Sequence, residues 1–347
     1  MPQIVDVRSD TVTRPTPAML TAMMSAVVGD DVYGEDETVN ELQRKAAELF
    51  GKEAALFCPS GTMTNQIAIR VHTQPGDEVI CDELAHVYLY EGGGIAANSG
   101  ASVRLIKGDR GRFTASQVAA HINRRDDPHF PWTRLVAVED TVNKGGGACW
   151  DIEELKRIRA VCDQYDLALH LDGARLFNAL AARNESPRDY GQLFHTISIC
   201  LSKGLGTPAG SLLLGSRELI AKARRCRKMM GGGMRQAGYL AAAGLFALEH
   251  NVNRLREDHA KARAIEAELR SLPYVASVLP VETNIVIFSL DERVKADRFL
   301  QELRRNGLHA ISMGQQMIRF VLHLDVSDSQ VSFLIETLRT LRVAPNA

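Results

Sequence analysis

The sequence predicts an α/β protein with a large, mostly parallel seven-stranded sheet covered by helices, followed by a smaller C-terminal α+β unit. Short, β-rich apolar runs alternate with longer stretches of helical pattern between about residues 54 and 215. Several of these runs are apolar at consecutive positions, as expected of strands buried on both faces. After about residue 240 the pattern changes to a long helix rich in Ala, Leu, Glu and Arg, followed by alternating strands and helices.

The predicted elements follow this division. The seven strands of the first part are expected at residues 54–57, 78–81, 103–106, 135–138, 167–171, 196–201 and 211–214. In the second part we expect helices at 255–270, 294–306 and 327–341 and strands at 284–290 and 317–324. The proline-punctuated segment 9–17 is predicted to be a loop or extended arm. The expected units are an N-terminal arm (1–20), the large α/β domain (21–245) and the small C-terminal domain (246–347).

Composition excludes several classes of function. The 347 residues contain 41 Lys and Arg against 42 Asp and Glu, so no global basic field is available to hold nucleic acid. The six cysteines are scattered without C-x-x-C spacing, which favours free thiols in a reducing cytoplasm over disulfides or a metal site. No apolar stretch reaches the length of a bilayer span, and the N-terminus lacks the features of a signal peptide. We therefore predict a cytoplasmic protein with small-molecule partners and no membrane contact.

Unusual polar residues follow two of the predicted strands. Asp172 and Arg175 come directly after the run that ends at residue 171, and Lys203 follows the next run along the chain. In open α/β sheets, ligands bind outside the carboxyl ends of the strands. Taken separately these residues are ordinary, because Asp172 could cap a helix, Arg175 could be exposed and Lys203 could be a loop lysine. Their combination at consecutive strand ends is far less ordinary.

This combination is what a pyridoxal phosphate site requires. A lysine amine forms the Schiff base, and an aspartate keeps the pyridine nitrogen protonated so that the ring accepts electrons from a bond broken at the substrate α-carbon. The arginine can hydrogen-bond the ring oxygen and a substrate carboxylate. The sequence therefore predicts pyridoxal 5'-phosphate as cofactor, with Lys203, Asp172 and Arg175 in these roles.

A seat for the cofactor phosphate is predicted where the first strand leads into a helix. Ser60, Gly61 and Thr62 stand at this turn, where free backbone N–H groups and the helix dipole favour an anion. A plain capped helix start explains this segment alone equally well. None of the glycine runs matches a G-x-G-x-x-G motif after a strand, so a dinucleotide site is weakly supported.

Several ordered motifs resemble those of the low-specificity L-threonine aldolases. They are RSDTVT (8–13), GDDVYGED (29–36), LHLDGAR (169–175), CLSKGLG (200–206), MGGGMRQ (230–236) and the run 318–327. The likeness covers nearly the whole chain. It implies the fold of the type I pyridoxal-phosphate enzymes and an aldehyde-lyase that cleaves L-threonine, L-allo-threonine and related β-hydroxy-α-amino acids to glycine and an aldehyde.

The resemblance also implies roles for individual residues. Lys203 binds the cofactor, Asp172 meets its pyridine nitrogen and His86 stacks on the ring. Gly61 and Thr62, with Ser60, hold the phosphate, and Arg235 reaches it across a subunit interface, so that the active site needs at least a dimer. We expect a homotetramer with the dimer as active-site unit, although the sequence does not decide between dimer and tetramer. The residues implied for the substrate are Ser9, Arg175 and Arg319, at its carboxylate. Apart from the resemblance, Tyr33 and Tyr90 could shape the substrate pocket, although tyrosines at strand and loop ends more often simply pack.

The proton acceptor for the β-hydroxyl group is left open by the sequence. His129 matches the family's flexible-loop histidine near the substrate hydroxyl, and His86 is the other candidate. If neither histidine is catalytic, His129 is expected to be a surface loop histidine and His86 a packing residue.

One motif departs from the family. Aldolases of this kind usually read Glu-Asn-Thr-His-Asn after the fourth strand, whereas this chain has Glu139-Asp140-Thr141-Val142-Asn143. An apolar group thus replaces a possible hydrogen-bonding group, which bears on side-chain preference and stereospecificity. Competing interpretations are another reaction of the same cofactor, namely β-elimination, racemisation or transamination, and a non-catalytic protein that binds pyridoxal phosphate. Ser9, His86, His129 and Arg319 favour aldol cleavage, and the retained Lys203 argues against a non-catalytic role.

Overall fold

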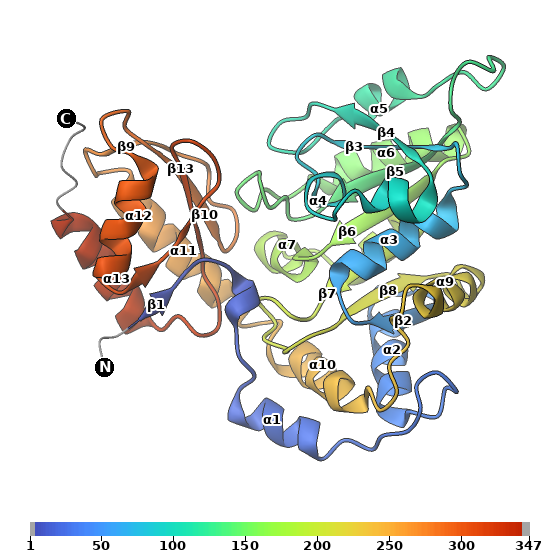
Figure 1. The fold of residues 1–347 in the computed structure, drawn as a ribbon, viewed down its shortest axis with the longest axis horizontal. Coiled ribbons are helices and arrows are strands. Elements are labelled where there is room, and N and C mark those ends of the chain that lie inside the picture. The colour runs from blue at the N-terminus through green and yellow to red at the C-terminus, as the bar shows by residue number, and fades with distance from the viewer. Residues whose placement is uncertain (1–3, 342–347) are drawn as a thin grey trace.

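Seven strands form one sheet in the larger lobe of the computed structural model, which describes residues 4–341 (Figure 1). In order across the sheet they are β2 (Ala54–Cys58), β8 (Ser211–Gly215), β7 (Thr196–Cys200), β6 (Ala168–Gly173), β5 (Thr133–Glu139), β3 (Glu78–Asp82) and β4 (Ser102–Ile106). Strands β4, β3, β5, β6 and β7 run parallel, whereas β8 is antiparallel to both β7 and β2. The prediction of a mostly parallel seven-stranded sheet is confirmed.

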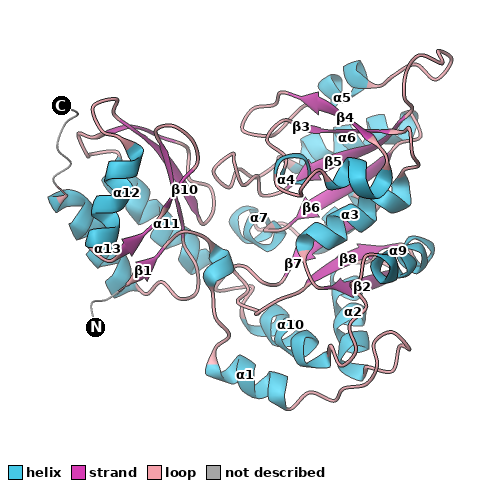
Figure 2. Ribbon diagram, viewed as in Figure 1, coloured by secondary structure: helices cyan, strands magenta, loops and turns pink. Residues whose placement is uncertain are grey.

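Each of the seven predicted strands lies within two residues of an observed one. Strands β3, β7 and β8 are buried at every position, which explains why their sequences are apolar without alternation. Helices cover both faces of the sheet (Figure 2). One face carries α3 (Gly61–His72), α9 (Arg217–Met229) and the short turn η2 (Ile95–Ser99). The other carries α2 (Glu37–Phe50), α5 (Ala115–His121), α6 (Ile152–Gln164) and α8 (Pro187–Leu193).

A second, four-stranded antiparallel sheet forms the smaller lobe. Its strands are, in order, β12 (Ile311–Ser312), β13 (Met317–Val321), β10 (Ile285–Leu290) and β9 (Val275–Val278). The helices of this lobe are α11 (Leu255–Leu269), α12 (Ala296–Arg305) and α13 (Asp328–Thr340). The three predicted helices and two predicted strands are all present, with shifted ends. The short strands β9 and β12 were not predicted, because two to four partly exposed residues leave no periodic pattern.

The N-terminal segment joins the two lobes. Strand β1 (Val5–Asp6) pairs in parallel with β11 (Leu308–His309), and Val5 and Val7 are buried in the core of the smaller lobe. The chain then makes the one-turn helix η1 (Asp10–Val12) and enters α1 (Pro17–Met24), which packs on α10 (Gly238–His250) of the larger lobe. The N-terminal segment therefore connects the two lobes. Its first residues pack in the smaller lobe, and the chain passes to the larger lobe from residue 9 onward.

The domain limits remain a prediction. Because α10 ends at His250 and α11 begins at Leu255, we propose that the small domain begins between these helices and includes residues 4–8. No helix among residues 4–341 combines the length and hydropathy needed to cross a bilayer.

Candidate active site

Two adjoining cavities lie at the carboxyl ends of the parallel strands. One, of about 410 Å³, is lined by residues of both lobes, and the other, of about 310 Å³, lies against the start of α3. They share two lining residues, His86 and Lys203. The larger is also lined by Ser9, Thr11, Tyr90, Asn143, Arg175, Ile311, Ser312, Met313 and Arg319, and the smaller by Pro59, Ser60, Gly61, Thr62, Asn65, Asp172, Ala174, Cys200, Ser202, Pro208 and Ala209.

Lys203 stands between the two cavities. It belongs to the loop that follows β7, and its backbone carbonyl accepts a hydrogen bond from Thr13 Oγ1 at 3.0 Å. Within residues 4–341 its ammonium group makes no hydrogen bond or ion pair, so the amine is available to an aldehyde.

Asp172 offers an unused acceptor inside the smaller cavity. It is the fifth residue of β6 and is 2% exposed; its Oδ1 accepts a hydrogen bond from Ala174 N at 3.2 Å. Its Oδ2 is buried and has no partner among the described residues. A buried carboxylate oxygen without a donor is costly, and a protonated ring nitrogen would supply that donor. Asp172 thus fits the role predicted for it toward pyridoxal phosphate.

The start of α3 provides the anion seat. Ser60 caps this twelve-residue helix, because its Oγ accepts a hydrogen bond from Met63 N at 3.2 Å. Gly61 is held close to the neighbouring strand, and a Cβ at this position would lie 2.5 Å from Cys200 Sγ. A side chain at position 61 would therefore collide with Cys200 of β7. Glycine at this position lets the start of α3 approach β7, so that its backbone N–H groups lie at the cavity wall. The predicted phosphate seat fits the local geometry.

His86 begins the short helix α4 (His86–Leu89) and is fixed at two points. Its backbone N–H donates to Glu139 Oε2 at 2.9 Å, and its Nδ1 lies 2.9 Å from Glu91 Oε1. Burial lowers the pKa of His86, but the hydrogen bond with Glu91 and the charges of Asp172 and Glu139 outweigh burial and raise it above its usual value. Burial and the charge of Asp172 raise the pKa of Glu139. The ring is thus held where it lines both cavities.

Two arginines face the larger cavity from different lobes. Arg175 is bound by Asp10 through two hydrogen bonds, from Nε at 2.8 Å and from Nη2 at 2.7 Å. Arg319, on β13, donates to Asn143 Oδ1 at 2.7 Å and to Arg8 O at 3.0 Å, and its buried Nε has no partner among the described residues. Burial and the charge of Arg175 lower the pKa of Arg319 to about 10. Two neighbouring cations with unused N–H groups suit a carboxylate ligand.

Three predicted site residues lie outside both cavities of a single chain. Tyr33 is 75% exposed. The side chain of His129 is 87% exposed and is bound to Asp127, on the loop before β5. The side chain of Arg235 is 54% exposed and pairs with Asp30 at 2.8 Å. One chain therefore brings together Ser9, Ser60, Gly61, Thr62, His86, Asp172, Arg175, Lys203 and Arg319, and leaves these three aside.

The two residues that differ from the family motif, Asp140 and Val142, do not line either cavity. Val142 is 1% exposed, and its side chain packs against Gly111 and Gly145. Asp140 is fully buried, and burial raises its pKa well above the usual range. Neither replacement puts an apolar group at the wall where a substrate side chain would lie.

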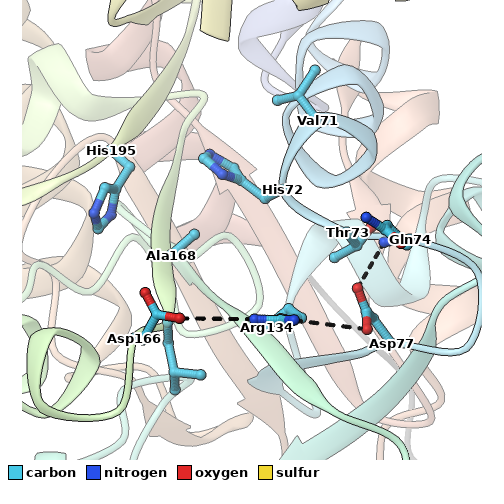
Figure 3. A pocket seen from close by; sticks show the side chains of 10 residues that line it. Val71, His72, Thr73, Gln74, Asp77, Arg134, Asp166, Ala168 and His195 are labelled. Atoms are coloured by element: carbon cyan, nitrogen blue, oxygen red, sulfur yellow. Dashed lines mark hydrogen bonds and ion pairs between the residues drawn. The ribbon is translucent and has the colours of Figure 1, made fainter.

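A further cavity, of about 410 Å³, lies at the opposite, amino-terminal edge of the sheet. Figure 3 shows Arg134 between Asp77 and Asp166, at 3.9 and 3.8 Å, with His72 and His195 nearby. Because ligands of parallel sheets bind beyond the carboxyl ends of the strands, we do not assign the catalytic site to this cavity.

The sequence interpretation missed three contacts of the site. Asp10 and Asn143 were quoted within motifs but given no role, although they hold Arg175 and Arg319. Glu91, which contacts His86, carried no signal in the sequence beyond its spacing of five residues.

Comparison with known proteins identifies the relatives of the chain. The family model described as β-eliminating lyase matches residues 6–293. The low-specificity L-threonine aldolase of Escherichia coli (strain K12) is 46% identical over 330 residues, which cover 95% of this chain and 96% of that protein. Low-specificity L-threonine aldolase 1 of Arabidopsis thaliana is 39% identical, with 95% and 94% covered.

Solved structures share the fold. A threonine aldolase of Leishmania major superposes with a TM-score of 0.83 at 22% identity, covering 96% of this chain and 98% of that one. A serine palmitoyltransferase of Sphingomonas wittichii gives a TM-score of 0.74 at 16% identity, with 97% and 86% covered. The expected fold class is confirmed.

Proposed function

Because the chain belongs to the β-eliminating lyase family, together with the low-specificity L-threonine aldolases, we propose that it uses pyridoxal 5'-phosphate to cleave L-threonine, L-allo-threonine and related β-hydroxy-α-amino acids to glycine and an aldehyde. The observation that carries this proposal is the unpartnered Oδ2 of Asp172 in the cavity that Lys203 also lines, together with two arginines in the adjoining cavity that suit a carboxylate. When bound, the cofactor supplies an electron sink for the bond broken at the substrate α-carbon.

Residues of the chain bind the cofactor, bind the substrate and take up the proton. Ser60, Gly61 and Thr62 hold the phosphate, Asp172 meets the ring nitrogen and Lys203 carries the cofactor. Arg175 and Arg319, with Ser9, hold the substrate carboxylate, which fixes the orientation of the Cα–Cβ bond. His86 and His129 are the groups that can take the proton of the β-hydroxyl group. Of the two, His86 lines the cavities of a single chain.

The proposal is tested with purified protein that has been supplied with pyridoxal phosphate. We expect a visible absorption band that changes on addition of L-threonine, L-allo-threonine or L-phenylserine, and equal amounts of glycine and aldehyde. Ammonia with a keto acid, or an inverted amino acid, would contradict aldol cleavage and leave the cofactor in place. Failure to take up the cofactor would contradict both.

We also propose a cytoplasmic homotetramer built from dimers, in which Arg235 reaches the phosphate seat of the partner subunit. Support comes from the exposed apolar side chains of Leu20, Met24 and Tyr239, on the packed helices α1 and α10. The six cysteines are all unpaired, as suits a reducing compartment.

A shared site predicts complementation between two defective chains. Lys203→Ala and Arg235→Ala should each be impaired, the second through cofactor affinity that is roughly 10-fold weaker after loss of a charge-assisted phosphate contact. Co-expressed chains that pair at random should recover about a quarter of the wild-type sites, because half of the dimers are mixed and each mixed dimer has one complete site. Activity of the purified mixture measures this recovery. If mixing restores nothing, or if Arg235→Ala binds the cofactor normally, Arg235 does not act across the interface.

A further inference from the structure

The side chain of Glu91 is a buried hydrogen-bond acceptor that contacts the ring of His86. Its carboxylate is fully buried and is surrounded by three donors: Oε1 lies 2.9 Å from His86 Nδ1 and accepts from Asn65 Nδ2 at 2.8 Å, and Oε2 accepts from Gln66 Nε2 at 2.6 Å. The amides of Asn65 and Gln66 each donate an N–H to one oxygen of Glu91, so both oxygens act as acceptors. Because Oε1 accepts, the proton on a neutral His86 ring lies on Nδ1.

The opposite nitrogen of His86 is then the basic one. Within residues 4–341, Nε2 makes no hydrogen bond, and the ring lines both cavities. The charged and titratable groups around this ring are Glu91 from the turn after α4, Glu139 from β5, Asp172 from β6, Lys203 and Arg175 from the cavity walls, and Tyr90 next to the ring. Glu91 is the one that contacts a ring nitrogen.

A chain of buried polar groups holds Glu91 in this orientation. Because Asn65 Nδ2 donates to Glu91, its Oδ1 faces His170 Nε2 at 3.1 Å and accepts from it. Burial lowers the pKa of His170 to about 4, so the ring is neutral, and its Nδ1 lies 3.0 Å from the Thr196 hydroxyl and 3.2 Å from the Thr196 carbonyl oxygen. The Thr196 hydroxyl also lies within hydrogen-bond distance of His72 Nε2, at 3.0 Å. His72 lines the cavity of Figure 3, so the chain of hydrogen bonds crosses the larger lobe.

We propose that Glu91 is a positioning residue that fixes His86 as its Nδ1–H tautomer and thereby presents a basic Nε2 to the hydroxyl group of the substrate. This rests on the proposed function and extends it, because it selects His86 over His129 as the group that takes the proton. A histidine oriented by a carboxylate on one nitrogen and free on the other is suited to general base catalysis.

The first test reads the tautomer directly and needs no turnover. Holoenzyme labelled with nitrogen-15 at histidine is observed by NMR without substrate, and the His86 signals are identified by their loss in His86→Asn. We expect a protonated Nδ1 and an unprotonated Nε2 above the pKa of the ring. A proton on Nε2 would overturn the proposal, whether or not the protein cleaves threonine. Conversely, absence of threonine cleavage with the expected tautomer would contradict the proposed function alone.

The second test uses Glu91→Gln with Gln66→Met as matched control. The introduced amide can donate to His86 Nδ1, which moves the ring proton to Nε2 and removes the basic nitrogen from the cavity. We expect kcat to fall by roughly 100-fold, with KM and cofactor affinity little changed. Because His86 acts when unprotonated and loses a charge that raises its pKa, the acid limb of the pH profile should move to lower pH.

Gln66→Met removes a donor to the other oxygen of Glu91 and leaves the contact with His86, so its tautomer and pH profile should remain those of the wild type. If Glu91→Gln keeps the wild-type tautomer and pH profile, Glu91 does not set the state of His86. If Gln66→Met changes both as strongly as Glu91→Gln does, the effect is a general loss of packing and the proposal fails.

Discussion

Replacement of Lys203 by alanine is expected to reduce kcat for L-threonine by roughly 10²- to 10⁴-fold, the range of a lost acid–base group. The physical reason is that Lys203 is the amine shared by both cavities, and its ammonium group makes no hydrogen bond or ion pair within residues 4–341. Lys203→Arg should lose as much activity, because a guanidinium keeps the positive charge but does not form a Schiff base. Steady-state kinetics and borohydride reduction, which fixes the cofactor aldehyde to an amine of the chain, measure the two effects.

A lysine away from the site serves as the control. Lys222, on α9, is exposed and pairs with Glu218 on the same helix. Lys222→Ala should keep wild-type activity and remain linked to the cofactor after reduction. If Lys203→Arg retains activity, or if reduction still fixes the cofactor to Lys203→Ala, then Lys203 contributes charge and another amine carries the cofactor.

The sheet and the cofactor side of the site could be predicted because both depend on short stretches of sequence. Strands covered by helices on both faces are apolar at consecutive positions, and the residues that follow them meet at one edge of the sheet. Asp172, Lys203 and the Ser60–Thr62 turn could therefore be predicted as neighbours from position alone, and all of them line the smaller cavity. The small-lobe strands β9, β11 and β12 were not, because their few residues pair through the backbone and carry no periodic signal.

The substrate side of the site depends on contacts between distant residues, which spacing cannot reveal. Arg175 was expected to bind a ring oxygen and a carboxylate, but two of its nitrogens are bound to Asp10, which is 165 residues earlier in the sequence. Arg319 reaches the same cavity from the other lobe. Tyr33, His129 and Arg235 remain predictions about the assembled protein, since one chain leaves them on its surface.

Asp10→Asn is expected to lower the free energy of unfolding by roughly 3–5 kcal/mol, because it leaves a buried guanidinium without its counter-charge. Asp10 is 0% exposed, and the side chain of Arg175 is 6% exposed. The same change frees Arg175 to move from the carboxylate of the substrate, so kcat/KM should fall by roughly 10- to 100-fold. Urea denaturation and steady-state kinetics measure the two quantities. Asp6→Asn is the matched control, because Asp6 forms the same type of pair with an exposed arginine, Arg8, and should cost at most about 1 kcal/mol.

The pH dependence separates the charge of Asp10 from its packing. Burial raises the pKa of Asp10, but the charge and hydrogen bonds of Arg175 outweigh burial and hold it at about 2. A carboxyl group whose pKa is depressed in the folded state stabilises the protein fully above its unfolded pKa, near 4, and loses this contribution as the pH falls toward 2. The difference in stability between the wild type and Asp10→Asn should therefore be constant above pH 5 and shrink below about pH 4. A difference that persists unchanged to pH 2 would mean that Asp10 acts through the hydrogen bonds that its two oxygens accept from Arg175 and that its charge contributes nothing.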